Sequence, residues 1–184
     1  MMQSPSLAGG VRRIFWGYCF LLLDFSLNFF GEFGLQLLPD ALGWALLWWG
    51  ITGLSPWRPS LGLLKPFCVV LGVSSLTQFF PGLDTLLPGW LDLLLAIMTL
   101  YAHFQLLTDM AAIAQERVSD GDRAVGLRAF RNALTVCQTA MYCYDLYNLV
   151  IAPPGLVLLL ALGLVCLHVF LLIQLWGLSR ELGE

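Results

Sequence analysis

Charged residues are scarce in this sequence, and no polar segment is large enough to form a separate soluble domain. Only 11% of the 184 residues are charged, 59% are apolar, and the mean hydropathy is +0.80. A typical soluble domain has about 25% charged residues. This shortage excludes an ordinary water-soluble protein, and the four arginines of the longest polar segment lie among four acidic residues, which argues against a nucleic-acid partner.

The sequence also lacks the short motifs of the common enzyme classes. It has no Gly-x-Ser-x-Gly, no His-Glu-x-x-His and no phosphate-binding loop. Two isolated histidines, His103 and His168, are too few to indicate a metal or haem centre, so we expect no cofactor. The five cysteines include no Cys-x-x-Cys pair, which favours free buried thiols. These absences argue against an enzyme.

Long apolar runs are what the sequence has in abundance. A helix needs roughly 20 apolar residues to cross a bilayer core about 30 Å thick. Six runs approach this length, at about residues 14–33, 40–56, 61–80, 86–108, 130–152 and 155–178. The sequence therefore predicts an all-α integral membrane protein, with residues 1–184 forming a single domain of six transmembrane helices and a cytoplasmic link at about residues 109–129.

Basic residues are absent from every second link between these runs. The nine lie before the first run, within or beside the second and fourth links, and after the last run: Arg12, Arg13, Arg58, Lys65, Arg117, Arg123, Arg128, Arg131 and Arg180. Basic residues concentrate on the cytoplasmic side of membrane proteins. The pattern predicts a multi-pass protein of the cell membrane, built as three helical hairpins with outward tips and with both termini in the cytoplasm.

Several tryptophans have an expected depth in this arrangement. Trp44 and Trp90 fall near the outer boundary of the membrane, where amphipathic rings prefer to lie. Trp48 and Trp49 lie deeper in the second helix, and we expect them to pack inside the protein.

Polar side chains inside the apolar runs are the most informative feature for function. Asp24, Asn28 and Glu32 are spaced four residues apart and therefore share one face of the first helix. Two further polar faces belong to the fourth and fifth helices; they consist of Asp92, Thr99 and His103, and of Thr135, Gln138, Tyr142 and Asp145.

A carboxylate inside the bilayer is unfavourable by about 2.5–3.5 kcal/mol on insertion scales. The expected topology places every Lys and Arg toward the cytoplasm, so Asp24, Asp92 and Asp145 have no internal cation. They are protonated, or they face a water-filled vestibule, or they bind a proton, a metal cation or a small cationic solute from outside. We predict a ligand-binding site formed by Asp24, Asn28, Glu32, Asp92, Gln138, Tyr142 and Asp145. The alternative is that these residues only hydrogen-bond the helices together.

One short element carries a family resemblance. It consists of Leu38, Pro39, Asp40, Gly43 and Trp44, preceded by Asp24 and Asn28. This region resembles the first third of an uncharacterised family of small polytopic membrane proteins from Gram-positive bacteria, which share a Leu-Pro-Asp-x-x-Gly-aromatic element. The resemblance implies a bacterial membrane protein and no activity. Size and topology are also similar to those of the substrate-binding subunits of energy-coupling-factor vitamin transporters, without their Ala-x-x-x-Ala docking face.

Two functions from different classes fit these features. The first is a solute- or cation-binding transport component with an outward-facing acidic site. The second is a non-catalytic accessory or scaffold protein that binds other membrane proteins, for which Gly43, Gly50 and Gly53 of the second helix offer a close-packing face. Both require the lipid bilayer as a partner.

A topology map tests the predicted orientation. A reporter that is active only in the cytoplasm should be active when it is fused after Arg123 or after Glu184, because both points follow basic segments. The same reporter should be silent when it is fused at Asp84. An active fusion at Asp84 would overturn the assignment of sides.

Overall fold

The computed structural model describes most of the chain. The described residues are 6–29, 39–77, 88, 90–118, 121–147 and 154–183. Within these, the side chains of residues 23–29, 39, 143–147 and 154–157 are not described.

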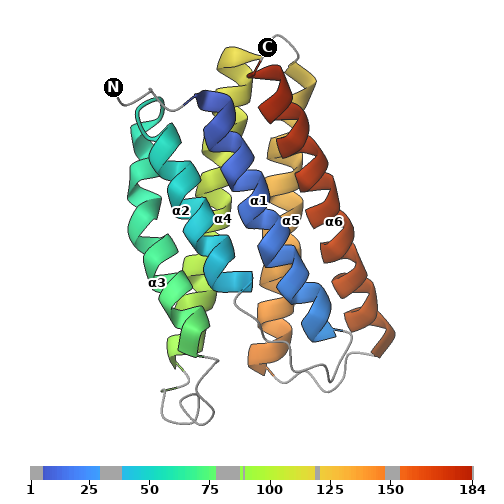
Figure 1. Ribbon diagram of the computed structural model, residues 1–184. Helices are drawn as coiled ribbons and strands as arrows, with labels where there is room; N and C mark the ends of the chain where they lie inside the picture. Colours follow the sequence, from blue (N-terminus) through green and yellow to red (C-terminus); the bar gives the residue numbers. More distant parts are fainter. Residues whose placement is uncertain are drawn as a thin grey trace.

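Six α-helices run alternately up and down through this part of the chain (Figure 1). They are α1 (Leu7–Phe29), α2 (Pro39–Leu54), α3 (Lys65–Thr77), α4 (Trp90–Arg117), α5 (Gly121–Tyr147) and α6 (Pro154–Glu181), and a 3-10 helix, η1 (Pro59–Leu64), leads into α3. The same described residues include no strand. The predicted all-α class is therefore confirmed.

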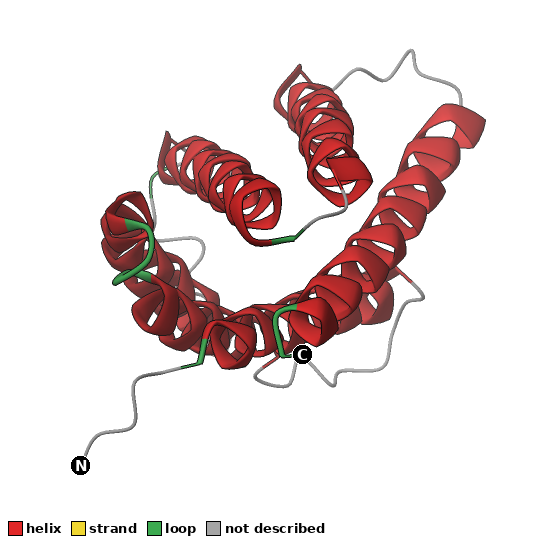
Figure 2. Ribbon diagram, turned by 90° about the horizontal axis from the view of Figure 1, so that it is seen from above, coloured by secondary structure: helices red, strands yellow, loops and turns green. Residues whose placement is uncertain are grey.

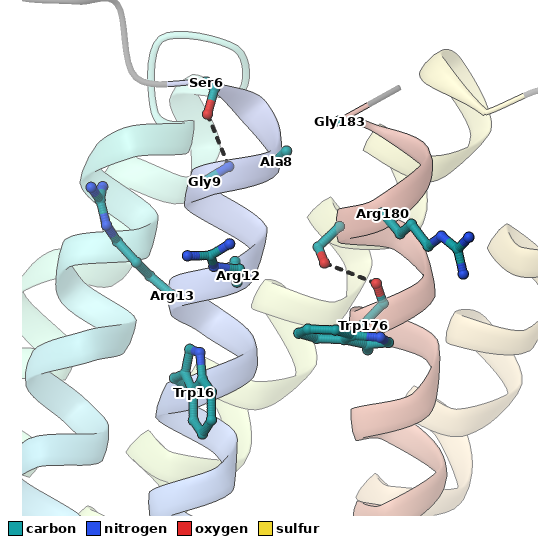
Figure 3. Close-up of a pocket in the computed structure, with 10 residues that line it drawn as sticks. Ser6, Ala8, Gly9, Arg12, Arg13, Trp16, Trp176, Arg180 and Gly183 are labelled. Carbon is teal, nitrogen blue, oxygen red and sulfur yellow. Dashed lines mark hydrogen bonds between the residues drawn. The ribbon is translucent and has the colours of Figure 1, made fainter.

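Local sequence explains where α1 and α2 begin. The hydroxyl of Ser6 accepts a hydrogen bond of 3.2 Å from the backbone N–H of Gly9 (Figure 3), so Ser6 is the N-cap of α1. Pro39 is the first residue of α2, where its missing N–H is not needed. Asp40 lies in the first turn of α2, where a negative charge interacts favourably with the helix dipole.

Three of the helical segments are long and apolar enough to cross a membrane, judged by length and composition of the described residues. They are Pro59–Thr77, Trp90–Arg117 and Leu158–Glu181. Large apolar side chains such as Leu63, Leu159 and Ile173 are exposed on the surface, as a lipid-facing protein requires. The chain is accordingly a candidate multi-pass membrane protein, whereas six spans remain a prediction.

The predicted link at residues 109–129 is mostly helical. Helix α4 continues to Arg117 and α5 already begins at Gly121. The buried apolar side chains in and next to this region are Met110, Ala111, Ile113, Ala114, Ala124, Leu127 and Phe130. Their spacing is that of an amphipathic helix. The charged residues between them lower the mean hydropathy without ending either helix.

The helices are neighbours in the order α3, α2, α1, α6, α5 and α4, with sparser contacts between α4 and α3 closing the ring. Figure 2 views the bundle along its axis. Because the helices alternate in direction, the start of α1 and the end of α6 lie at one end of the bundle (Figure 1). All nine basic residues lie in this half of the structure, and we call it the basic end.

Glycines bring α1 and α2 into backbone contact. Gly10 and Gly17 of α1 are seven residues apart, as are Gly43 and Gly50 of α2, so each pair lies on one helix face. In the antiparallel arrangement Gly17 meets Gly43, and a Cβ atom on Gly17 would lie 3.0 Å from the Gly43 carbonyl oxygen. A Cβ on Gly50 would lie 3.0 Å from the Gly10 oxygen.

This contact corrects the expected use of the glycine face of α2. Gly43, Gly50 and Gly53 are all buried within the chain, and Gly43 and Gly50 pack on α1. The face suggested for binding another membrane protein is therefore occupied internally.

The expectation that Trp48 and Trp49 pack inside the protein is wrong. Trp44 is only 6% exposed, whereas Trp48 and Trp49 are 42% and 55% exposed. The buried face of α2 follows Trp44, Leu47, Ile51 and Leu54, a spacing of three and four residues. Trp48 and Trp49 fall on the opposite face, and the guanidinium of Arg13 lies 4.5 Å from the Trp49 ring centroid.

Substituting the contact glycines tests this packing. Gly17→Ala and Gly50→Ala should each lower the free energy of unfolding by about 1–3 kcal/mol, because a Cβ would meet backbone atoms that cannot rotate away. Gly163→Ala in α6 is the matched control, since a Cβ there meets nothing within 4 Å. Reversible denaturation in mixed micelles measures all three. Equal stability of the four proteins would contradict the close helix contact.

Candidate functional site

Four side chains from four helices meet in the core around His103. The His103 ring, 6% exposed, stacks on the Trp44 ring with centroids 5.6 Å apart and planes inclined by 10°. The ring centroid of Tyr18 lies 5.5 Å from that of His103. The amide nitrogen of Gln138 lies 3.3 Å from Nδ1 of His103. We call Tyr18, Trp44, His103 and Gln138 the His103 cluster.

Three polar atoms of this cluster are buried and have no hydrogen-bond partner within the described part of the chain. They are the Tyr18 hydroxyl, Nε2 of His103 and Oε1 of Gln138. Leaving a buried polar group unpaired is unfavourable by about 1–3 kcal/mol, and nearly all such groups in proteins have a partner. The cluster therefore has unused capacity to bind water or a polar solute.

The chemistry of these atoms defines what they can bind. When the Gln138 amide donates to Nδ1, the neutral imidazole carries its proton on Nε2. Nε2 is then a donor, the Gln138 oxygen an acceptor, and the Tyr18 hydroxyl either one. A donor, an acceptor and a group of both kinds suit water or a small polar solute, and toward a cationic group only the Gln138 and Tyr18 oxygens can accept.

The structure brings together only part of the predicted site. Gln138 contacts His103, and Tyr142 lies one turn further along α5 and is half-buried. Asp92 is exposed in the first turn of α4, eleven residues from His103, which corresponds to roughly 16 Å along the helix. Asp92 and Gln138 therefore do not share one compact site.

The remaining predicted residues are not fully described. Asp24 and Asn28 lie on α1 and Asp145 lies on α5, but their side chains are outside the described residues, as is Glu32 altogether. By helix rise, Asp24 is roughly 9 Å beyond Tyr18 and Asp145 roughly 10 Å beyond Gln138. Both displacements point away from the basic end.

A buried carboxylate that the sequence analysis did not select lies nearer the basic end. Asp109 of α4 is 5% exposed; its Oδ1 accepts a 2.8 Å hydrogen bond from the Ser60 hydroxyl, and its Oδ2 a 3.1 Å bond from the Gln105 amide. Gln105 and Asp109 are four residues apart, a spacing that joins side chains on one helix face. The predicted link begins at residue 109, so the sequence alone does not indicate this pairing.

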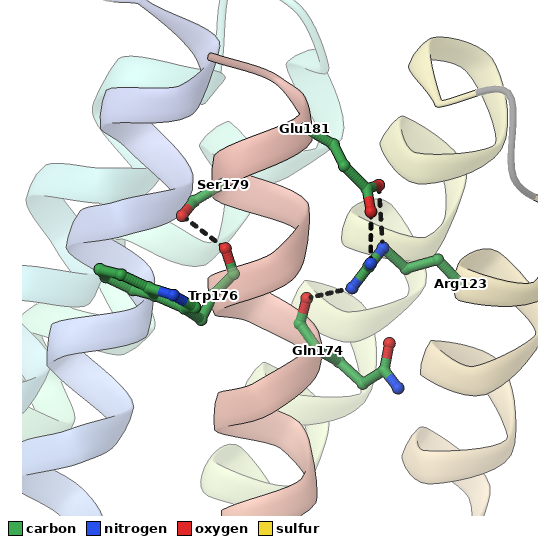
Figure 4. Close-up of polar contacts among 5 residues, drawn as sticks. All are labelled: Arg123, Gln174, Trp176, Ser179 and Glu181. Carbon is green, nitrogen blue, oxygen red and sulfur yellow. Dashed lines mark hydrogen bonds and ion pairs between the residues drawn. The ribbon is translucent and has the colours of Figure 1, made fainter. Parts of the chain in front are cut away.

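Arginines at the basic end hold neighbouring helices together. The guanidinium of Arg123 on α5 contacts both carboxylate oxygens of Glu181 on α6 and donates a 3.2 Å hydrogen bond to the Gln174 carbonyl (Figure 4). Arg58 pairs with Glu116 at 2.5 Å. Within the described residues, no arginine or lysine contacts the His103 cluster.

No protein-family model, curated protein or solved structure matches this chain. Among the described side chains, no three His, Cys, Asp or Glu residues gather as a metal site would require. The family resemblance of the Leu38 to Trp44 element stays a prediction, although Gly43 and Trp44 have structural roles at the α1 contact and on His103.

Removing the Ser60 hydroxyl tests the Asp109 network. Ser60→Ala should lower the free energy of unfolding by about 1–3 kcal/mol, because a buried carboxylate oxygen loses its donor. Ser179→Ala is the control, since the Ser179 hydroxyl is exposed and bonds only to the Trp176 carbonyl of its own helix; its effect should stay within about 0.5 kcal/mol. Similar small effects for both variants would show that the Ser60 bond adds nothing to stability.

Proposed function

We propose that this chain is a six-span protein of the cell membrane, with both termini in the cytoplasm, and that it binds a proton or a small cationic solute as a transport component. The ligand enters from the end opposite the arginines. The His103 cluster forms the floor of the binding site.

The observation that carries the proposal is the set of three buried, unpartnered polar atoms on Tyr18, His103 and Gln138. Packing alone does not require them, because apolar groups of the same shape would avoid the desolvation penalty. They belong to three different helices, so a solute that binds all three groups also links these helices.

The charge distribution supports a cationic ligand. All nine basic residues lie at the basic end of the bundle. Asp24 and Asp145 lie on α1 and α5 beyond the cluster, toward the opposite end, which we call the acidic end. Carboxylates without a neighbouring base attract protons and cations in a medium of low dielectric constant. A cation approaching from this side passes the turns of α1 and α5 that contain Asp24 and Asp145 before it reaches the His103 cluster.

Two neighbours fix the imidazole for this role. The Trp44 ring covers one face of His103 at a stacking distance, and the Gln138 amide contacts Nδ1. A ring fixed on two sides loses little further conformational entropy when Nε2 binds a ligand.

Charge removal at Asp24 tests the ligand class. The melting temperature of the purified protein should depend on pH and on cations or amines, because a ligand that binds only the folded state stabilises it. Asp24→Asn keeps the shape of the side chain and should lose most of this dependence. Indistinguishable profiles for the two proteins across pH and a panel of cations and amines would exclude a site that uses Asp24.

The Tyr18 hydroxyl offers a second test that does not involve charge. Tyr18→Phe removes an unpartnered hydroxyl, so the ligand-free protein should be as stable as the wild type or more stable. For a ligand that stabilises the wild type, the apparent affinity of Tyr18→Phe should be about tenfold lower, because one hydrogen bond to the ligand is lost. Tyr101→Phe is the control, because Tyr101 is exposed on α4 and packs on Phe67. Equal effects of the two substitutions would remove Tyr18 from the site.

A further inference from the structure

A groove lies between α1 and α6 at the basic end, remote from the His103 cluster. Its volume is about 660 Å³, and Figure 3 shows it between the first turns of α1 and the last turns of α6. It is lined by Ser6, Ala8, Gly9, Arg12, Arg13, Trp16, Trp176, Ser179, Arg180 and Gly183. The proposed function uses none of these residues.

The groove has a strongly positive lining. Arg12, Arg13 and Arg180 line it and no acidic residue does, but the Arg13 guanidinium lies on the Trp49 ring and Arg13 and Arg180 extend away from the groove (Figure 3), so Arg12 is the arginine available to a ligand. Arg12 is exposed and, within the described part of the chain, has no ion pair or hydrogen bond. Arg123, by contrast, is neutralised by Glu181 on the other side of α6 (Figure 4). An anion in the groove would give Arg12 a partner.

Helix α1 adds a second source of positive potential. Its first turn lines the groove through Ala8 and Gly9, and the N-terminus of a helix carries a partial positive charge. Phosphate groups bind well where a helix N-terminus and arginine side chains converge.

The wall of the groove toward the centre of the bundle is aromatic. Trp16 and Trp176 are 50% and 51% exposed, and the Phe15 ring packs between them with centroid distances of 5.3 Å to Trp16 and 5.2 Å to Trp176. Half-exposed tryptophans are typical of the boundary between headgroups and acyl chains. Below Trp176, exposed Ile173 and Val169 continue the same face of α6.

We propose that this groove binds the phosphate of an anionic phospholipid. Arg12 contacts the headgroup, the two tryptophans lie at the level of the glycerol, and the acyl chains follow the exposed apolar face of α6. A soluble phosphate compound would use the arginines but would leave the tryptophans and the apolar face without a role. The lipid therefore accounts for both parts of the groove.

Native mass spectrometry of the full-length protein in detergent measures this preference. Binding of phosphatidylglycerol is compared with that of phosphatidylcholine, and glycerol 3-phosphate is the soluble probe. In Arg12→Gln the preference for phosphatidylglycerol should fall about fivefold, the effect expected for one arginine near an anionic headgroup. Arg12→Lys should retain most of it.

Arg128→Gln is the matched control, because it removes one charge from the same end of the bundle. Arg128 is exposed on α5 and contacts Gln115 of α4, outside the groove. A loss in Arg12→Gln with none in Arg128→Gln supports the site. Equal losses, or no loss in either variant, would overturn it, and binding of glycerol 3-phosphate as tight as that of phosphatidylglycerol would overturn the assignment to a lipid.

Discussion

The backbone contact between α1 and α2 at Gly17 and Gly43 determines much of the interior. Tyr18 follows Gly17 and Trp44 follows Gly43, so the contact brings these two rings to the same height in the bundle. Both rings then pack on His103 of α4. Because a larger residue at either glycine would separate the helices, the geometry of the His103 cluster depends on a contact between residues that carry no functional group.

The separation of charge along the bundle axis is the second organising feature. At the basic end, several arginines have a carboxylate or aromatic partner on a neighbouring helix, as with Arg123 on Glu181, Arg58 on Glu116 and Arg131 on the Phe104 ring. These contacts hold the bundle together there. In the other half, Asp24 and Asp145 lie on helices that have no basic residue nearby in sequence. This separation is the basis of the two ligands of opposite charge that we propose.

Hydrophobic runs and their polar interruptions predicted the all-α class. Helical spacing put Gln138 on a polar face of the fifth helix, and in the structure its amide contacts His103 of α4. The same reasoning did not find Tyr18, Trp44 or Asp109 as members of polar clusters. Single-helix periodicity shows which residues share a face but not which helix that face meets, and Tyr18 and Trp44 gain significance only through their contact with His103. The helices extend into residues 109–129, beyond the ends expected from the apolar runs, because mean hydropathy falls in an amphipathic helix even though one face stays buried.

Solvent access to Gln138 is the most direct test of the central claim that a polar site opens toward the acidic end. In a variant whose five native cysteines are replaced by alanine, Gln138→Cys can be exposed to a small membrane-impermeant thiol reagent from each side of the membrane. If the site opens outward, this cysteine should react when the reagent is added outside and not when it is added on the cytoplasmic side. Reaction from the cytoplasmic side alone, or no reaction in a protein that retains its fold, would contradict it.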